Sequence, residues 1–149
     1  MDKSLVSAGL LALALSTLSG SAAAAECRPI VSDAWIRLPP TPAMPMSAGF
    51  ARIQNPCAQA ISIVGAESLS FGDVSLHESR VVEGVNRMRE IDALPVAPKQ
   101  SVELKPGGLH LMLMHPETPL KAGEELVITL KLKDGRSLPA TFTVRKAGP

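Results

Sequence analysis

Turn-forming residues divide this chain into short segments, and that punctuation limits the folds open to it more than any other feature. Prolines and glycines are spread evenly after residue 25, and no window of a dozen residues there shows sustained helical periodicity. The segments between the turns are rich in β-branched and apolar residues, which is typical of strands. Nine short strands are expected, at 34–37, 49–53, 61–64, 74–77, 87–91, 101–104, 109–114, 126–132 and 140–144.

This succession of short strands predicts an all-β fold, a Greek-key antiparallel β-sandwich formed by a single domain. The length of 149 residues is enough for one hydrophobic core. Turn chemistry separates the strands: in the turn after residue 104, Pro106 has the fixed φ of a second turn position, and Gly107 supports the positive φ of a third. The proline-rich stretch from Leu38 to Met46 is expected to be a loop, because too few residues precede it to form another core.

Residues 1–25 are expected to be a cleaved secretory signal peptide, which leaves 26–149 as the folded, exported domain. An apolar stretch from Leu5 to Leu18 is followed by small residues, which suit signal-peptidase cleavage after Ala25. The apolar stretch is short for a membrane anchor, and no later segment approaches the ~20 apolar residues of a spanning helix. A lipoprotein signal is disfavoured because the acidic Glu26 directly precedes Cys27.

Export would place the two cysteines, Cys27 and Cys57, in an oxidising compartment, where they are expected to pair with each other. No C-x-x-C spacing is present, which argues against a redox or metal-binding role for them.

The overall charge is close to balanced, with Lys+Arg 15 and Asp+Glu 14, which argues against nucleic-acid binding. An enzyme is also disfavoured. The sequence has no G-x-S-x-G elbow, no phosphate-binding Walker loop and no H-E-x-x-H zinc motif, and its carboxylates show no spacing of an acid–base pair.

The histidines and methionines are the residues that suggest a binding chemistry. In an extended strand over 109–114, alternation places His110, Met112 and Met114 on one face and the two leucines on the other. His77 likewise points away from the core side of its own strand. Singly, each such residue is more often structural. As a set, neutral imidazole and thioether donors favour Cu(I) over hard cations.

The spacing of four of these residues matches a known motif. His77, ten residues, Met88, twenty-one residues, His110, one residue and Met112 follow the pattern H-x10-M-x21-H-x-M. With matching surroundings at 33–37, 48–50 and 104–114, the chain resembles the periplasmic copper chaperones of the PCu(A)C family. The resemblance implies a cupredoxin-like β-sandwich that binds one Cu(I) through these four side chains, and it leaves Cu(II) binding open.

The resemblance also implies delivery of copper to the copper-A centre of a respiratory cytochrome oxidase. The expected partners are therefore a copper ion and a copper-A domain or another copper carrier, and the chain is expected to be a monomer. Copper storage and a metal-free interaction module are the alternatives. An electron-transfer cupredoxin is disfavoured, because a blue-copper centre needs a cysteine thiolate. Met114 is not one of the motif ligands and is interpreted as a packing residue or as a residue that supports the ligands. Met44, Met46 and His115 lie outside the motif, and whether they assist is left open.

Overall fold

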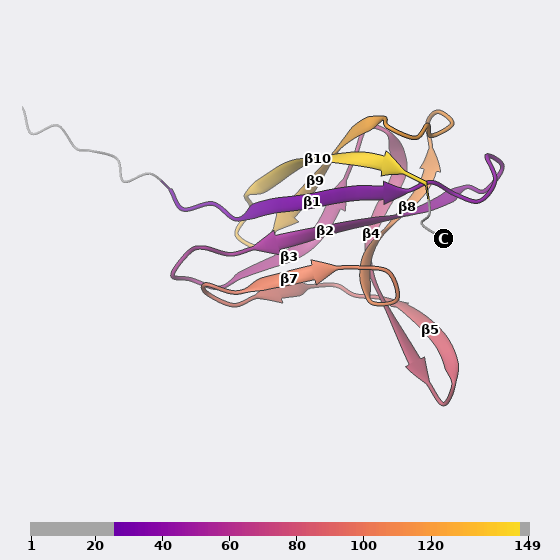
Figure 1. Ribbon diagram of the computed structural model, residues 1–149. Coiled ribbons are helices and arrows are strands. Elements are labelled where there is room, and N and C mark those ends of the chain that lie inside the picture. The colour runs from indigo at the N-terminus through magenta and orange to yellow at the C-terminus, as the bar shows by residue number, and fades with distance from the viewer. Residues whose placement is uncertain (1–25, 147–149) are drawn as a thin grey trace, which may run out of the picture.

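The computed structural model describes residues 26–146, which form ten β-strands and no helix (Figure 1). The strands are β1 (Ile30–Arg37), β2 (Met46–Gln54), β3 (Ile61–Glu67), β4 (Phe71–Val82), β5 (Val85–Glu90), β6 (Leu94–Val96), β7 (Ser101–Leu104), β8 (Leu109–Pro116), β9 (Glu125–Leu132) and β10 (Ser137–Arg145). The predicted all-β class is confirmed. The expected signal peptide, residues 1–25, lies outside the described residues, as do residues 147–149 at the end of the expected domain.

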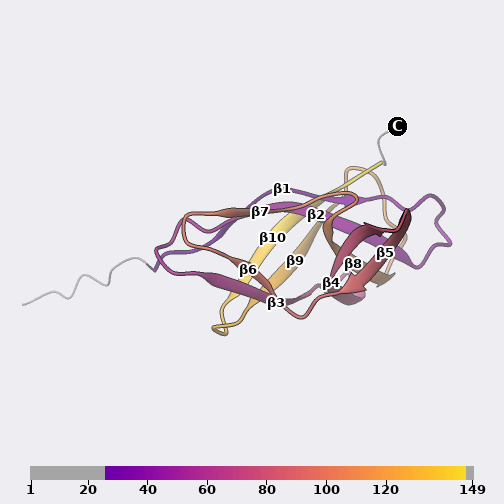
Figure 2. The same cartoon turned by 90° about the horizontal axis from the view of Figure 1, so that it is seen from below.

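One hydrogen-bonded path joins nine strands in the order β5-β4-β8-β2-β1-β10-β9-β3-β6. Strand β2 pairs with β8 through its first half and with β7 through its second half. A single sheet therefore folds around the core, where the sequence suggested two sheets; β7 and β1 lie over one side of it and β3 lies over the other (Figure 2). All pairs are antiparallel except β1 with β10, the first and last strands, whose parallel pairing no local signal could indicate.

The strand missing from the prediction is β6, which is three residues long and contains Pro95. Proline has no backbone N–H to give to a ladder, so a proline within a short run argues against a strand. Here Leu94 and Val96 on either side of it are buried, and they pair with β3. Burial of these two side chains outweighs the unfavourable local propensity.

The core is built from the inward-facing residues of nearly every strand. Alternation along β8 buries Leu111 and Leu113 completely, and Leu76 on β4 packs against the same cluster, as the sequence predicts. Other fully buried core residues are Ile36, Ile53, Ile63, Ile128, Leu130 and Phe142. Because these strands direct their apolar side chains to the core, the side chains on their outer faces are free to form a binding site.

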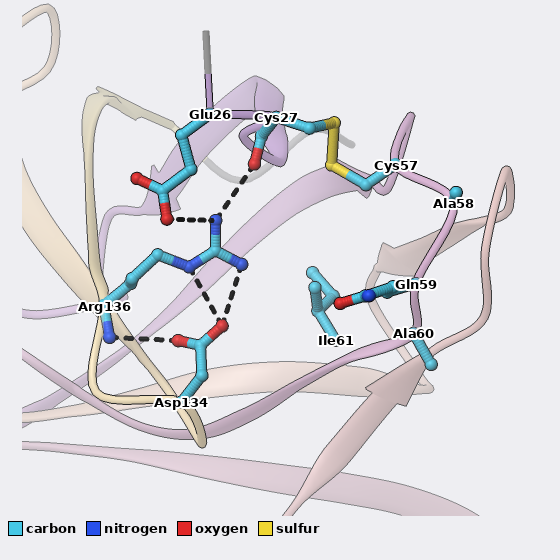
Figure 3. A pocket seen from close by; sticks show the side chains of 9 residues that line it. All are labelled: Glu26, Cys27, Cys57, Ala58, Gln59, Ala60, Ile61, Asp134 and Arg136. Atoms are coloured by element: carbon cyan, nitrogen blue, oxygen red, sulfur yellow. Dashed lines mark hydrogen bonds and ion pairs between the residues drawn. A yellow bond between two sulfur atoms is a disulfide. The ribbon is translucent and has the colours of Figure 1, made fainter. Parts of the chain in front are cut away.

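The N-terminal end of the described chain is fastened in two ways (Figure 3). Cys27 and Cys57 form the expected disulfide, with their Cα atoms 5.7 Å apart. The Arg136 guanidinium donates a hydrogen bond to the Cys27 carbonyl oxygen (2.9 Å) and forms an ion pair with Asp134 (2.8 Å). The disulfide joins the segment before β1 to the loop between β2 and β3, and Arg136 joins it to the turn between β9 and β10.

Asn55 comes directly after β2 and is buried, and its side chain forms hydrogen bonds with backbone groups of neighbouring segments. Its Nδ2 donates to the carbonyl oxygens of Gln59 (2.8 Å) and Val96 (3.1 Å), and its Oδ1 accepts from the Cys57 N–H (3.1 Å). Asn55→Ala is expected to lower the free energy of unfolding by about 2–4 kcal/mol, because these backbone groups would lose their partners inside the protein.

Urea denaturation monitored by fluorescence of Trp35 measures this effect. The control is Asn86→Ala on exposed strand β5, where the expected change is within about 0.5 kcal/mol. An Asn55→Ala loss as small as that of the control would contradict the role given to the buried amide.

Candidate metal centre

The outer face of strands β4 and β8 carries two histidines directly opposite each other. His77 and His110 are register partners, and their rings lie with centroids 5.9 Å apart and planes inclined by 29°. Their strand neighbours Leu76 and Leu111 point into the core. The opposite orientation of imidazoles and leucines is the one that strand alternation predicts.

The surroundings of His110 favour one tautomer of its neutral ring. Only 6% of this residue is exposed, and its Nδ1 lies 3.0 Å from the carbonyl oxygen of Gly108. A carbonyl oxygen can only accept, so Nδ1 carries the proton in the neutral ring and Nε2 keeps its lone pair. That Nε2 lies 3.2 Å from the sulfur of Met88. Two electron-pair donors therefore face each other, close to the ~3.5 Å that separates nitrogen and sulfur ligands of one tetrahedral ion.

His77 also has a ring nitrogen available. Its Nε2 lies 3.1 Å from the Ser75 hydroxyl, while its buried Nδ1 has no hydrogen-bond partner within the described residues. Burial lowers the pKa of His77, and the nearby His110 lowers it further, against the opposing effect of Glu90 and Asp73. The ring is therefore favoured in the neutral form that a metal ligand requires.

Of the two motif methionines, Met88 lies on β5, beside the strand that carries His77, and Met112 lies on β8, two residues after His110. Met88 lies on the edge strand β5 and is 52% exposed. Met112, half-buried on β8, is paired with Ala48 of β2 and Ser75 of β4, both of which have small side chains. Met88, His110 and Met112 line one apolar groove of about 220 Å³, whose walls also include Arg37, the 38–40 segment, Met44, Met46, Ser47 and Ala48. His77 is not part of the groove wall, but its ring stacks on that of His110, which is.

The carboxylate that follows His77 in the sequence is paired with arginines. Glu78 follows His77 on β4, and its side chain forms ion pairs with Arg80 (2.8 Å) and Arg89 (2.9 Å). Hydrogen bonds from these two guanidinium groups lower the pKa of Glu78. Between residues 26 and 146, no group of three or more His, Cys, Asp and Glu side chains could hold a metal ion. The candidate donor set is thus neutral and rich in sulfur, which suits a soft monovalent ion.

An aromatic support beside His110 was not predicted. Phe50 on β2 lies with its ring centroid 6.5 Å from that of His110 and 4.7 Å from that of Trp35. The Arg37 guanidinium carbon lies 5.1 Å from the Phe50 ring centroid and 5.9 Å from that of Trp35. In the sequence, the segments 33–37 and 48–50 contribute only to the family resemblance. The β1–β2 register, which pairs Trp35 with Phe50, brings them together.

The remaining candidate residues separate into two groups. Met44 and Met46 lie in the groove wall, whereas the exposed His115 is not among the groove residues. Met114 is on the same outer face, between Met46 and Asp73.

A larger cavity, of about 460 Å³, lies at the other end of the molecule beside the Cys27–Cys57 disulfide (Figure 3). It has neither histidine nor methionine in its lining.

Comparison with known proteins identifies the family. The model of the LpqE-like lipoprotein family matches residues 30–144. The chain belongs to the LpqE-like (PCuAC) family. The chain is also similar to lipoprotein Lxx21020 of Leifsonia xyli subsp. xyli, with 31% identity over 116 residues, 77% of this chain and 68% of the relative. Protein RP573 of Rickettsia prowazekii is 30% identical over 104 residues, 69% of this chain and 58% of that protein.

Solved PCuAC domains have the same fold as this family member. The copper-bound PCuAC domain from PmoF2 superposes with a TM-score of 0.66 at 18% identity, covering 80% of this chain and 93% of that domain. The Cu(I) form of DR1885 from Deinococcus radiodurans gives a TM-score of 0.60 at 28% identity, covering 81% of each chain. The predicted cupredoxin-like β fold is confirmed. No helix suited to crossing a membrane occurs among residues 26–146.

Proposed function

We propose that this protein binds one Cu(I) through His77, Met88, His110 and Met112 and carries it as a copper chaperone. The observation that carries the proposal is the approach of His110 Nε2 to Met88 Sδ, at 3.2 Å. The Gly108 carbonyl leaves that nitrogen without a proton in the neutral ring, so neither atom can bond to the other, and both are free to bind a shared ion. The structural relatives PmoF2 and DR1885, solved with copper and with Cu(I), support copper as the metal.

The donor chemistry favours Cu(I) in particular. Thioether sulfur is a soft, neutral donor, and two thioethers with two imidazoles bring no negative charge to attract Mg²⁺, Ca²⁺ or Zn²⁺. The two cysteines are joined in a disulfide far from the groove, so no thiolate is available for a blue-copper centre. Binding of Cu(II) is secondary to this function, and no catalytic step is required of the protein.

The exposed position of Met88 supports a carrier role. Met88 lies on an edge strand and is half exposed, so an acceptor can approach the metal from this side and replace one ligand at a time. The proposed recipient of the copper is the copper-A centre of a respiratory oxidase. The protein is proposed to act as a monomer in the periplasm, as a 26–149 domain released from a 1–25 signal. The disulfide supports an oxidising compartment, and the family description as lipoproteins supports export.

Delivery is tested by mixing the Cu(I)-loaded protein with an isolated, metal-free copper-A domain. The two proteins are separated by ion exchange, and the copper in each is measured by atomic absorption. Net movement of copper to the copper-A domain is expected. Copper that stays with this protein would contradict delivery and favour sequestration.

The ligand assignment predicts different effects for two methionines on the same strand face. Met112→Leu keeps the volume of the side chain and removes its sulfur, so Cu(I) affinity is expected to fall about tenfold or more. Met114→Leu is expected to change the affinity by less than about threefold, because Met114 is outside the proposed set. Competition with a colorimetric Cu(I) chelator measures both values. Equal effects of the two substitutions would contradict the assignment.

A further inference from the structure

Two methionines outside the proposed ligand set line the same groove. Met44 and Met46 lie in the loop between β1 and β2 and at the first position of β2, and they are 38% and 39% exposed. Both are in the groove wall with Met88 and Met112. Both side chains are therefore partly accessible to solvent at the edge of a groove that also holds the two motif methionines.

The backbone holds these two residues in place relative to β8. The Met44 N–H donates to the Thr41 carbonyl oxygen (3.1 Å), which closes a turn, and the Pro45 carbonyl oxygen accepts from the His115 N–H (2.7 Å). Proline between the two methionines fixes one of the backbone dihedral angles. The thioethers are therefore carried on a segment anchored to the strand that bears His110 and Met112.

Strand register places the outer and inner sulfur atoms on one continuous surface. Met46 pairs with Met114, and Ala48 pairs with Met112, so residues two apart on β2 share a face with residues two apart on β8. The small side chain of Ala48 lies between Met46 and the inner group, and it also lines the groove. No bulky residue on β2 separates the two pairs of methionines.

We propose that Met44 and Met46 form an outer position for a monovalent soft metal ion, which exchanges Cu(I) with the inner His–Met group. The identity of the metal rests on the proposed function. Two solvated thioethers make this position weaker than the four-ligand group, and the positively charged Arg37 in the groove wall disfavours divalent ions. The transfer is a ligand exchange: Cu(I) gains one thioether bond as it loses another, and neither an electron nor a proton is moved.

Methionine-methyl NMR of the protein with ¹³C-labelled methionine methyl groups tests the outer position, with Ag(I) as a monovalent soft ion that is not redox active. The first equivalent is expected to shift the methyl signals of Met88 and Met112, and further Ag(I) is expected to shift those of Met44 and Met46. Unshifted Met44 and Met46 signals, beside shifted inner signals, would overturn the outer position and leave the proposed function intact. No shift at any of the four would overturn both.

The variant Met44→Leu/Met46→Leu keeps two apolar side chains of similar volume and removes both sulfur atoms. Loss of the second Ag(I) equivalent is expected. Removal of Cu(I) from the loaded variant by a chelator is expected to be slowed roughly tenfold, because the outer position raises the local probability of exchange. Val127→Leu, an exposed substitution outside the groove, is the control. Removal as fast as in the wild type would overturn the inference.

Discussion

Replacing His110 with alanine is expected to lower the Cu(I) affinity by a factor of about 100 or more, equivalent to about 2.7 kcal/mol. This residue is at the centre of the candidate site: it faces the Met88 sulfur, stacks on His77 and is supported by Phe50. Its bond to Gly108 orients the nitrogen that is proposed to bind the metal. Removal of the ring deletes one donor and the contact that orients the others. Competition against a Cu(I) chelator of known affinity provides the measurement.

His115→Asn is the matched control for this experiment. His115 is exposed and has a positive φ of 52°, which asparagine tolerates better than most residues. The Cu(I) affinity of the His115→Asn variant is expected to match that of the wild type. Because His110 is buried, thermal unfolding of His110→Ala without metal establishes that the variant is folded. A folded His110→Ala protein with unchanged affinity would rule out the proposed copper site.

The double substitution Cys27→Ser/Cys57→Ser is expected to lower the free energy of unfolding by about 3–4 kcal/mol. The disulfide closes a loop across a sequence separation of 30 residues, and its loss restores that conformational freedom to the unfolded chain. Urea denaturation under non-reducing conditions measures the difference from the wild type. A loss below about 1 kcal/mol would contradict this account of the disulfide.

Copper binding separates a stability effect of the disulfide from an effect on the site. Strand β1 begins next to Cys27 and ends at Arg37, which lines the groove, so the disulfide and the groove are at opposite ends of that strand. At temperatures where the double variant is folded, its copper stoichiometry is expected to equal that of the wild type. Loss of copper from the folded variant would show that the cysteines take part in binding.

Local chemistry in the sequence was enough to find most of the strands, since turn residues such as Pro106 and Gly107 mark where strands end. It missed β6 because Pro95 counts against a strand, whereas burial of Leu94 and Val96 decides the outcome. The continuous sheet and the parallel β1–β10 pair could not be predicted from the sequence for a different reason. They depend on which strands meet after folding, and this information is not contained in any short segment.

In the candidate site, too, the sequence predicts features set within one strand and misses features set by pairing between strands. Alternation within one strand predicts correctly that His110 and Met112 face away from the leucines of β8. The motif spacing comes from the family resemblance. The aromatic support from Trp35 and Phe50, and the groove position of Met44, depend on how β1, β2 and β8 pair with one another. Such details require the register between strands far apart in the sequence.

The parallel pairing of β1 with β10 has a practical consequence for laboratory work. Because Arg37 pairs with Arg145, the last strand ends beside the groove, whereas the described chain begins at the disulfide end (Figure 1). The eight residues of β1 separate these two ends by about 25 Å. A polyhistidine purification tag fused after β10 is expected to bring extra imidazoles close to the proposed copper ligands and to distort metal titrations. A tag fused ahead of Cys27 keeps those imidazoles at the opposite end of the strand.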